Sequence, residues 1–185
     1  MNPILLNFPE QFESERLLIR CPRPGDGQAM YDAIVESLDE LKPWMPWAHR
    51  EQSVASAEEF VRHKQAEWLL REDLMMLLFR KSDGLFIGGS GLHRIDWNVP
   101  RFETGYWCRT SIAGNGYIRE STAAITQFAF DVLKAHRIEI RVDDRNEKSW
   151  RVAERCGFAL EGILRNHALN TSGVLRDTRI YAKTR

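Results

Sequence analysis

The sequence predicts an α+β fold with a mixed, mostly antiparallel sheet of about seven strands flanked by helices. Three observations lead to this prediction. Runs of apolar and β-branched residues, separated by turn residues, fill the middle and the end of the chain. A long amphipathic helix follows the middle runs, and a strictly alternating strand comes directly after that helix. A helix between neighbouring strands forms a crossover, so the sheet is expected to be mixed.

The first part of the chain is predicted to form one strand and two helices. Arg16–Arg20 is an apolar run between charges and is closed by turn residues. From Asp26 apolar residues recur at helical spacing, and a second helical stretch covers about Ala55–Arg71. Between these helices the sequence LKPWMPW carries bulky apolar side chains on a loop, because Pro43 and Pro46 prevent a regular helix.

The middle of the chain is predicted to form three strands. Leu74–Arg80 and Leu85–Arg94 flank a turn at Gly84, which indicates an antiparallel hairpin. A third run, Arg101–Arg109, follows the turn at Asn98–Pro100 and leads directly into the segment AGNG. The sheet is therefore expected to be a meander up to this point.

The rest of the chain alternates between helix and strand. Tyr117–Ala135 is predicted as the long amphipathic helix, and Arg137–Asp143 as the alternating strand. Asn146 is expected to cap a further helix that ends at Gly157. The remaining residues, Phe158–Arg185, are predicted to form two strands joined by a turn.

Composition narrows the class of protein. A chain of 185 residues, 43% of them apolar, is long enough to bury one core, so residues 1–185 are predicted to form a single domain. The 26 basic residues balance 26 acidic ones, so we expect neither a nucleic-acid partner nor a membrane. Three widely spaced cysteines argue against a disulfide framework and against a CxxC metal site. We expect a cytoplasmic protein without a metal.

A glycine-bearing loop lies where a strand stops and the long helix begins. The loop contains Gly114 and Gly116, and the helix starts at Tyr117. A helix start presents unpaired backbone N–H groups and the positive end of the helix dipole, and glycine lets a phosphate approach the backbone. The loop lacks the Lys and Ser/Thr of a P-loop and the GxGxxG of a dinucleotide fold. By itself it fits a pyrophosphate site and a plain tight turn equally well.

The neighbours of this loop resemble one family. The region Glu103–Phe158 resembles the GNAT superfamily of N-acetyltransferases and, within it, the RimJ/RimL-like branch. AGNGYI stands in the place of the family's phosphate loop, ETGYWC is similar to E-x-G-Y-W-L, and DDRNEKSWRVAERCGF is similar to N-x-x-S-x-x-x-x-E-x-x-G-F. SERLLIR and LKPWMPW also match the branch, and so do Gly173, Asp177 and Tyr181.

The resemblance implies a GNAT fold and an acetyltransferase that uses acetyl-CoA as co-substrate. A primary amine would attack the thioester directly in a ternary complex. Ala113 and Ile118 depart from the family's usual residues, so we expect weaker rather than absent CoA binding. The residues expected to contact acetyl-CoA are Tyr106, Trp107, Cys108, Gly114, Asn115, Gly116, Tyr117, Ile118, Arg119, Asn146 and Ser149.

The catalytic groups are assigned by the same resemblance. Glu103 is the first candidate for the base, with His93 as an alternative, and each has a plain structural role as its competing interpretation. Many GNAT enzymes protonate the CoA sulfur with a Tyr on the helix after the alternating strand. This chain has none there, so Ser149 is the candidate acid, or alternatively part of the helix cap. A backbone N–H of Tyr106–Cys108 is expected to stabilise the oxyanion. Cys108 is rejected as a nucleophile because no motif places a base beside it.

The acceptor side is the least determined. Trp44, Trp47 and Glu103 are expected to contact the acceptor, although the two tryptophans could equally anchor their loop to the core. The RimJ/RimL-like resemblance implies a protein N-terminal α-amine as acceptor. The alternatives are a small amine (polyamine, amino acid or aminoglycoside) and a CoA-binding sensor that has lost turnover. The oligomeric state stays open, and a homodimer is one of the options.

Overall fold

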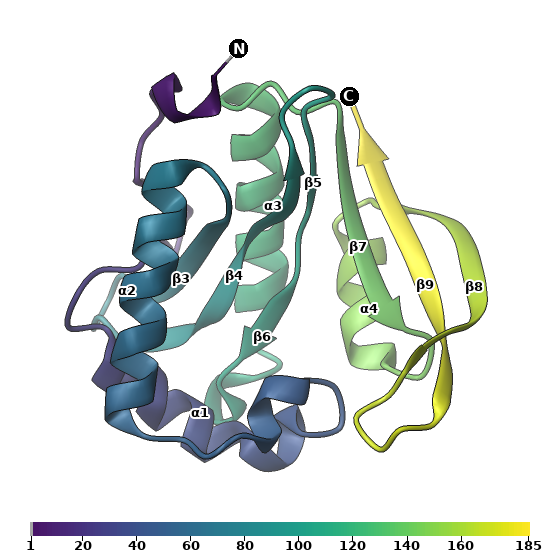
Figure 1. The fold of residues 1–185 in the computed structure, drawn as a ribbon, viewed down its shortest axis with the longest axis horizontal. Helices are drawn as coiled ribbons and strands as arrows, with labels where there is room; N and C mark the ends of the chain where they lie inside the picture. The colour runs from purple at the N-terminus through teal and green to yellow at the C-terminus, as the bar shows by residue number, and fades with distance from the viewer. Residues whose placement is uncertain (1) are drawn as a thin grey trace.

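A single nine-stranded sheet runs through the computed structural model, which describes residues 2–185 (Figure 1). The strands are β1 Gln11–Glu13, β2 Leu17–Arg20, β3 Leu74–Arg80, β4 Phe86–Asp96, β5 Arg101–Glu103, β6 Tyr106–Cys108, β7 Arg137–Asp143, β8 Ala159–Leu169 and β9 Leu175–Thr184. The order across the sheet is β1-β2-β3-β4-β5-β7-β9-β8, and β6 pairs with β4. Only the pair β5–β7 is parallel among these described strands. The predicted mixed, mostly antiparallel α+β sheet is confirmed.

Helices cover both faces of the sheet. They are α1 Gly27–Leu41, α2 Val54–Leu70, α3 Tyr117–Asp131 and α4 Glu147–Arg155, with short 3₁₀ turns at Pro3–Leu5, Pro46–His49 and Thr110–Ile112. The side chains of β3 alternate between two apolar clusters, as the period of a strand requires. Leu74, Met76 and Leu78 join the cluster that includes α3, whereas Met75 and Leu77 join the one that includes α1.

The count of about seven strands is corrected to nine. The N-terminal strand β1 was not predicted; it pairs along β2. The predicted strand Arg101–Arg109 is in fact two strands, β5 and β6, separated by Thr104 and Gly105. The cause is a change of partner, because β5 pairs with β7 and with the far end of β4, while β6 pairs with Gly88–Ser90 of β4.

This change of partner opens the sheet. β7 pairs with β5 only as far as Glu139, and no strand of the described chain pairs with Ile140–Asp143 on that side. Figure 1 shows β6 and β7 diverging below β5. Gly88 allows β6 to lie close to β4, because a Cβ at this residue would stand 2.1 Å from the carbonyl oxygen of Trp107. The open edge of β6 therefore faces the opening.

Helix ends follow local signals. Ser53 caps α2 through a capping box with Ser56, and the Asn146 side chain caps α4 by accepting a bond from the Ser149 N–H, as predicted. α3 ends at Asp131 rather than at the predicted Ala135. The reason is that Lys134 adopts a left-handed backbone with φ of 57°, which ends the helical path.

Candidate active site

The opening between β6 and β7 holds a cavity of about 190 Å³. One wall is Thr104–Tyr106, the opposite wall is Ile140–Asp143 of β7, and the start of α4 contributes Asn146 and Ser149. Trp44 and the turn between β8 and β9 close the rim. Segments far apart in the sequence thus surround the open edge of β6.

A larger cavity of about 400 Å³ lies next to it, on the face covered by α1 and α2. Its lining is mainly apolar and includes Met30, Trp47, Phe60, Met75, Tyr106 and Trp107. The two cavities share Met45, Gly105 and Tyr106 as lining residues. They therefore meet at the start of β6, so two molecules, one in each cavity, could contact each other at that strand.

The tyrosine at this junction is held by α4. The Tyr106 hydroxyl donates to the backbone oxygen of Ser149 at 2.8 Å, and the Ser149 hydroxyl lies 3.5 Å from the Tyr106 oxygen. Burial raises the pKa of Tyr106 well above its ordinary value, so this hydroxyl keeps its proton. The sequence did not suggest that a tyrosine hydroxyl would reach Ser149, because the two residues are 43 positions apart.

The start of α3 has the geometry of an anion site. Gly114 and Gly116 adopt left-handed φ values of 84° and 81°, and Gly116 is the N-cap without a side-chain capping bond. The N–H groups of Tyr117, Ile118 and Arg119 have no intrahelical acceptor at this position. No atom of the described chain lies within 4 Å of a Cβ built on Gly114, so that part of the loop is open to a ligand.

Arg16, which was not predicted as a site residue, braces this loop. Its Nε lies 2.6 Å from Oε2 of Glu120 in the first turn of α3, and its Nη1 donates to the Asn115 carbonyl at 3.1 Å. The guanidinium also lies 4.4 Å from the centre of the Tyr117 ring. The only signal in the sequence was the match of SERLLIR to the family, which gave Arg16 no partner.

The other residues predicted at this loop are exposed to solvent or contact nearby groups of the protein. The Asn115 amide donates to the Ile112 carbonyl at 2.9 Å. Arg119 has an exposed side chain, and its carbonyl oxygen lies 3.4 Å from the Cys156 sulfur, which joins α3 to the end of α4. Ile118 is half-buried and packs against the larger apolar core, which explains why a bulky residue is accommodated here.

Cys108 lies on β6 beyond Trp107. Burial raises the pKa of its thiol to about 11. A thiol of that pKa is protonated at neutral pH and is a poor nucleophile. This agrees with the rejection of Cys108 as a covalent catalyst.

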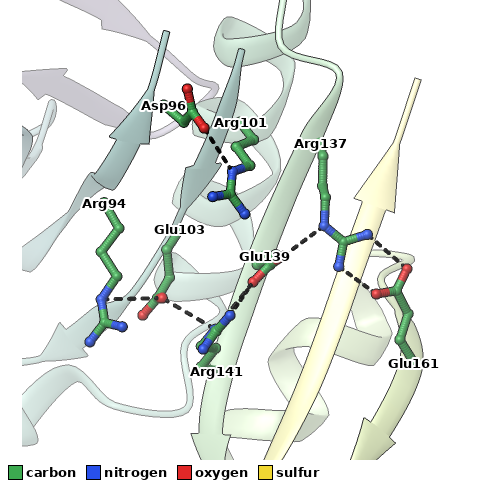
Figure 2. Close-up of polar contacts among 8 residues, drawn as sticks. All are labelled: Arg94, Asp96, Arg101, Glu103, Arg137, Glu139, Arg141 and Glu161. Atoms are coloured by element: carbon green, nitrogen blue, oxygen red, sulfur yellow. Dashed lines mark hydrogen bonds and ion pairs between the residues drawn. The ribbon is translucent and has the colours of Figure 1, made fainter. Parts of the chain in front are cut away.

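Glu103 belongs to a chain of alternating charges across the sheet (Figure 2). Its Oε2 lies 3.5 Å from Nε of Arg94 and 3.5 Å from Nε of Arg141. Arg141 continues to Glu139 at 3.1 Å, and Glu139 to Arg137 at 2.7 Å, which in turn pairs with Glu161. The Glu103 side chain is only 21% exposed, yet Glu103 is not among the lining residues of either cavity.

His93 lines the larger cavity instead. It is the direct cross-strand partner of Glu103, so the two side chains project from the same face of the sheet. The His93 Nδ1 lies 2.8 Å from Oδ2 of Asp73. The sequence offered His93 only as the alternative base, because Asp73 stands 20 positions away and belongs to no recognisable motif.

The two tryptophans of the predicted acceptor loop line different cavities. Trp47 lines the larger cavity, and its ring meets that of Trp107 edge to face at 5.9 Å. Trp44 lines the cavity at the opening of the sheet. One tryptophan therefore borders each cavity.

No set of three or more His, Cys, Asp or Glu side chains within residues 2–185 is grouped to hold a metal ion. None of the described helices has the length and apolar character needed to cross a membrane.

The fold and the family match define one class of enzyme, the acetyl-CoA-dependent acyltransferases. The acetyltransferase (GNAT) domain family matches residues 16–159, so the chain belongs to the GNAT acetyltransferases. It is 29% identical over 173 residues to "Putative ribosomal N-acetyltransferase YdaF" of Bacillus subtilis (strain 168), covering 91% of each chain. It is also 26% identical to the ribosomal-protein-serine acetyltransferase of Escherichia coli (strain K12), covering 92% of this chain and 93% of that protein.

Solved structures show the same fold. The chain resembles RimL, a ribosomal α-N-protein acetyltransferase solved in complex with coenzyme A, with a TM-score of 0.87. The two are 21% identical, and the match covers 95% of this chain and 98% of that one. The expected GNAT fold is confirmed, together with the RimJ/RimL-like resemblance and the use of acetyl-CoA.

Proposed function

We propose that this enzyme acetylates the N-terminal α-amine of a protein by direct attack of that amine on acetyl-CoA in a ternary complex. The observation that carries the proposal is the meeting of two cavities at Gly105 and Tyr106. Two binding sites that share one wall suit a reaction in which both substrates are bound at once. The ribosomal-protein names of two relatives support a protein acceptor.

In this proposal acetyl-CoA occupies the opening of the sheet. The N–H groups at the start of α3, with Gly114 and Gly116, would bind the pyrophosphate through backbone donors. The Oδ1 of Asn146 accepts a bond from Ser149 at 3.1 Å, which leaves the Asn146 NH₂ group to donate to the pantetheine arm. Because most of these donors belong to the backbone, the departures at Ala113 and Ile118 would weaken the site without removing it.

The thioester would then lie against β6. Alternate residues of a strand direct their N–H groups to opposite sides, and β6 has a partner strand on one side only, so it retains a donor for the oxyanion. Ser149 is proposed to protonate the CoA sulfur. The Ser149 hydroxyl donates to the Tyr106 oxygen at 3.5 Å, a contact that supports the position of Ser149 beside β6.

The larger cavity would receive the acceptor. Its mainly apolar lining, with Trp47 and Trp107 in contact, suits an extended peptide whose first side chains are apolar or small. A volume of about 400 Å³ also fits a small amine, which keeps the small-molecule acceptor as the second candidate. We further propose that residues 1–185 act as one domain, and that the enzyme is cytoplasmic, since its three cysteines are unpaired.

A panel of acceptors tests the proposal. Short peptides with free N-termini, the same peptides carrying an N-terminal acetyl group, and small amines such as spermidine would be compared by release of the CoA thiol. We expect turnover only with the free-terminus peptides. Turnover with small amines but with no peptide would show that the acceptor is a small amine and not a protein N-terminus. Binding of acetyl-CoA without thiol release from any amine would instead identify a CoA-binding sensor.

A further inference from the structure

A histidine and a buried carboxylate form a pair at the wall of the larger cavity. His93 extends from β4, and Asp73 stands in the connection between α2 and β3. The His93 side chain is 31% exposed and that of Asp73 only 17%, so the imidazole reaches the cavity while its partner is shielded. Asp73 also faces Lys64 of α2, whose Nζ lies 3.5 Å from Oδ1 and 2.6 Å from Glu67.

The charge state of Asp73 fixes the tautomer of His93. Burial raises the pKa of the Asp73 carboxyl, but the hydrogen bond and charge of His93, with Lys64, outweigh burial and leave that pKa below its ordinary value. An ionised carboxylate can only accept, so Nδ1 of a neutral His93 must carry the proton. The other ring nitrogen, Nε2, is then the one with a free lone pair.

The carboxylate is only partly satisfied. Oδ1 of Asp73 is buried and has no hydrogen-bond partner within residues 2–185. Nζ of Lys64 lies 3.5 Å from this oxygen as an ion contact. Such an oxygen costs free energy unless charge develops beside it. Formation of an imidazolium at His93 would place that charge at 2.8 Å from the same carboxylate.

Several other charged groups surround His93. Glu103 stands opposite on β5, but it is shared between Arg94 and Arg141. Arg94 follows His93 on β4 with an exposed side chain, and the remaining charged residues of the cavity wall are Arg50, Glu51 and Lys64. Asp73 is therefore the only one of these groups in hydrogen-bond contact with the imidazole.

His93 is also close in the fold to the edge where acetyl-CoA is proposed to lie. Ser90, three residues before it on β4, is the cross-strand partner of Tyr106 and donates from its hydroxyl to the Gly105 carbonyl at 2.8 Å. His93, Gly105 and Tyr106 line the same cavity. An amine positioned at the start of β6 would have His93 on its own wall.

From this arrangement we infer that His93, oriented by Asp73, is the base that accepts the proton of the attacking amine. This inference rests on the proposed function and assigns the base to a residue other than Glu103. As the amine nitrogen forms a bond to the thioester carbon, Nε2 of His93 takes the proton that the nitrogen loses. The C–S bond breaks, its electron pair stays on the CoA sulfur, and that sulfur takes up a proton. His93 then releases its proton to water.

The decisive experiment compares kcat at saturating acetyl-CoA and acceptor peptide between pH 5.5 and 9. We expect His93→Gln to lose on the order of 100-fold or more in kcat at neutral pH and to lose the acidic limb of the profile. His63→Gln is the control, because His63 is an exposed residue of α2 whose Nε2 lies 3.7 Å from a carboxylate oxygen of Glu59, away from both cavities. It should stay within about twofold of the wild type in kcat, since a surface contact of this kind carries little energy.

Asp73 is a positioning residue, and its test uses the same kinetic measurements. Asp73→Asn should reduce kcat about tenfold and leave KM for both substrates nearly unchanged, because the imidazole loses the carboxylate that orients it. In Glu103→Gln the acidic limb should stay in place. If Glu103→Gln removes that limb and His93→Gln keeps it, the base is Glu103 and the inference is overturned.

Three further readouts separate a chemical role from damage to the fold. The affinity for acetyl-CoA, measured by calorimetry, should be unchanged in His93→Gln, and added imidazole should restore part of the rate of His93→Gly. Nitrogen NMR of the wild type labelled at histidine should show Nδ1 protonated at neutral pH and lose that state in Asp73→Asn. A wild type with Nε2 protonated would contradict the inference. A wild type that acetylates no amine would refute the proposed function instead.

Discussion

The two sides of the active site are built in different ways. The proposed acetyl-CoA side comes mainly from the stretch of chain between β6 and α4, with Trp44 and the turn between β8 and β9 at the rim, and its donors at the start of α3 are backbone groups. The proposed acceptor side collects side chains from α1, α2, the Trp47 loop, β3, β4 and β6. A site of backbone groups depends on loop geometry, whereas a site of scattered side chains depends on how distant elements pack.

This difference explains what each side reveals in the sequence. Glycines at fixed spacing before a helix are visible as a motif, and the family resemblance was carried by that stretch. The pair His93 and Asp73 has no such spacing, and its contact exists only because β4 lies beside β3. The sequence therefore indicates the acetyl donor, but it does not indicate the acceptor.

The strongest test of the backbone side is Gly116→Pro. Proline requires a φ near −65° and has no N–H, whereas Gly116 stands at +81° as the N-cap of α3. We expect CoA affinity to fall by about 100-fold or more, since several backbone donors move together. Calorimetric titration with CoA measures the affinity of the variant. Gly84→Pro, at a left-handed glycine in the turn between β3 and β4, is the control for general backbone strain. Unchanged CoA affinity in Gly116→Pro would contradict the proposed pyrophosphate site.

The two tryptophans test whether the cavities are separate sites. Trp47→Ala should raise KM for the acceptor roughly tenfold or more through lost apolar contact, with KM for acetyl-CoA nearly constant. Trp44→Ala should do the reverse, because Trp44 lines the opening of the sheet. Steady-state kinetics with each substrate varied in turn would reveal the split. Equal effects on both KM values would mean that the loop only supports the fold.

Ser149 separates catalysis from helix capping. If its hydroxyl protonates the CoA sulfur, Ser149→Ala should lower kcat about tenfold or more with little change in either KM, and Ser149→Thr should restore part of the rate. The cap uses the backbone N–H of Ser149, so stability should change little in either variant. Asn146→Ala is the contrasting variant, expected to cost about 1 kcal/mol of stability through loss of the cap. A normal kcat in Ser149→Ala would leave Ser149 with a structural role only.

The smallest effect is expected at Cys108. Burial raises the pKa of its thiol to about 11, so the thiol is protonated at pH 7. Cys108→Ala should therefore change kcat by less than about threefold, a change that reflects packing alone. Product release traces should show no burst of CoA before the acceptor is added. An acetylated enzyme detected by mass spectrometry would contradict direct attack.

Most of the fold followed from local patterns. The alternating strand Arg137–Asp143, the capped helix after Asn146 and the long helix beginning at Tyr117 all form as predicted. The errors lie where long-range pairing decides the structure. The run Arg101–Arg109 looks continuous along the chain but divides because β5 and β6 take different partners, and β1 is stabilised only by pairing with β2.

The candidate site divides along the same line. The loop from Ala113 to Arg119 has the helix-start geometry that its glycines predicted, but nothing near SERLLIR announced that Arg16 would brace it. Glu103 lies next to the site, and the two arginines that share it come from different strands. The contact of Tyr106 with Ser149 likewise joins β6 to α4 across 43 positions.

The sequence alone indicated the class of enzyme, because the family resemblance is carried by contiguous stretches of chain, including the helix start, whose local geometry depends mainly on neighbouring residues. Only the tertiary structure decided which side chains line the larger cavity and which carboxylate contacts His93. Those relations arise when β3, β4 and α2 pack together, because this packing brings the Asp73 carboxylate to 2.8 Å from Nδ1 of His93. That distance depends on how the chain packs, and no single segment of the sequence indicates it.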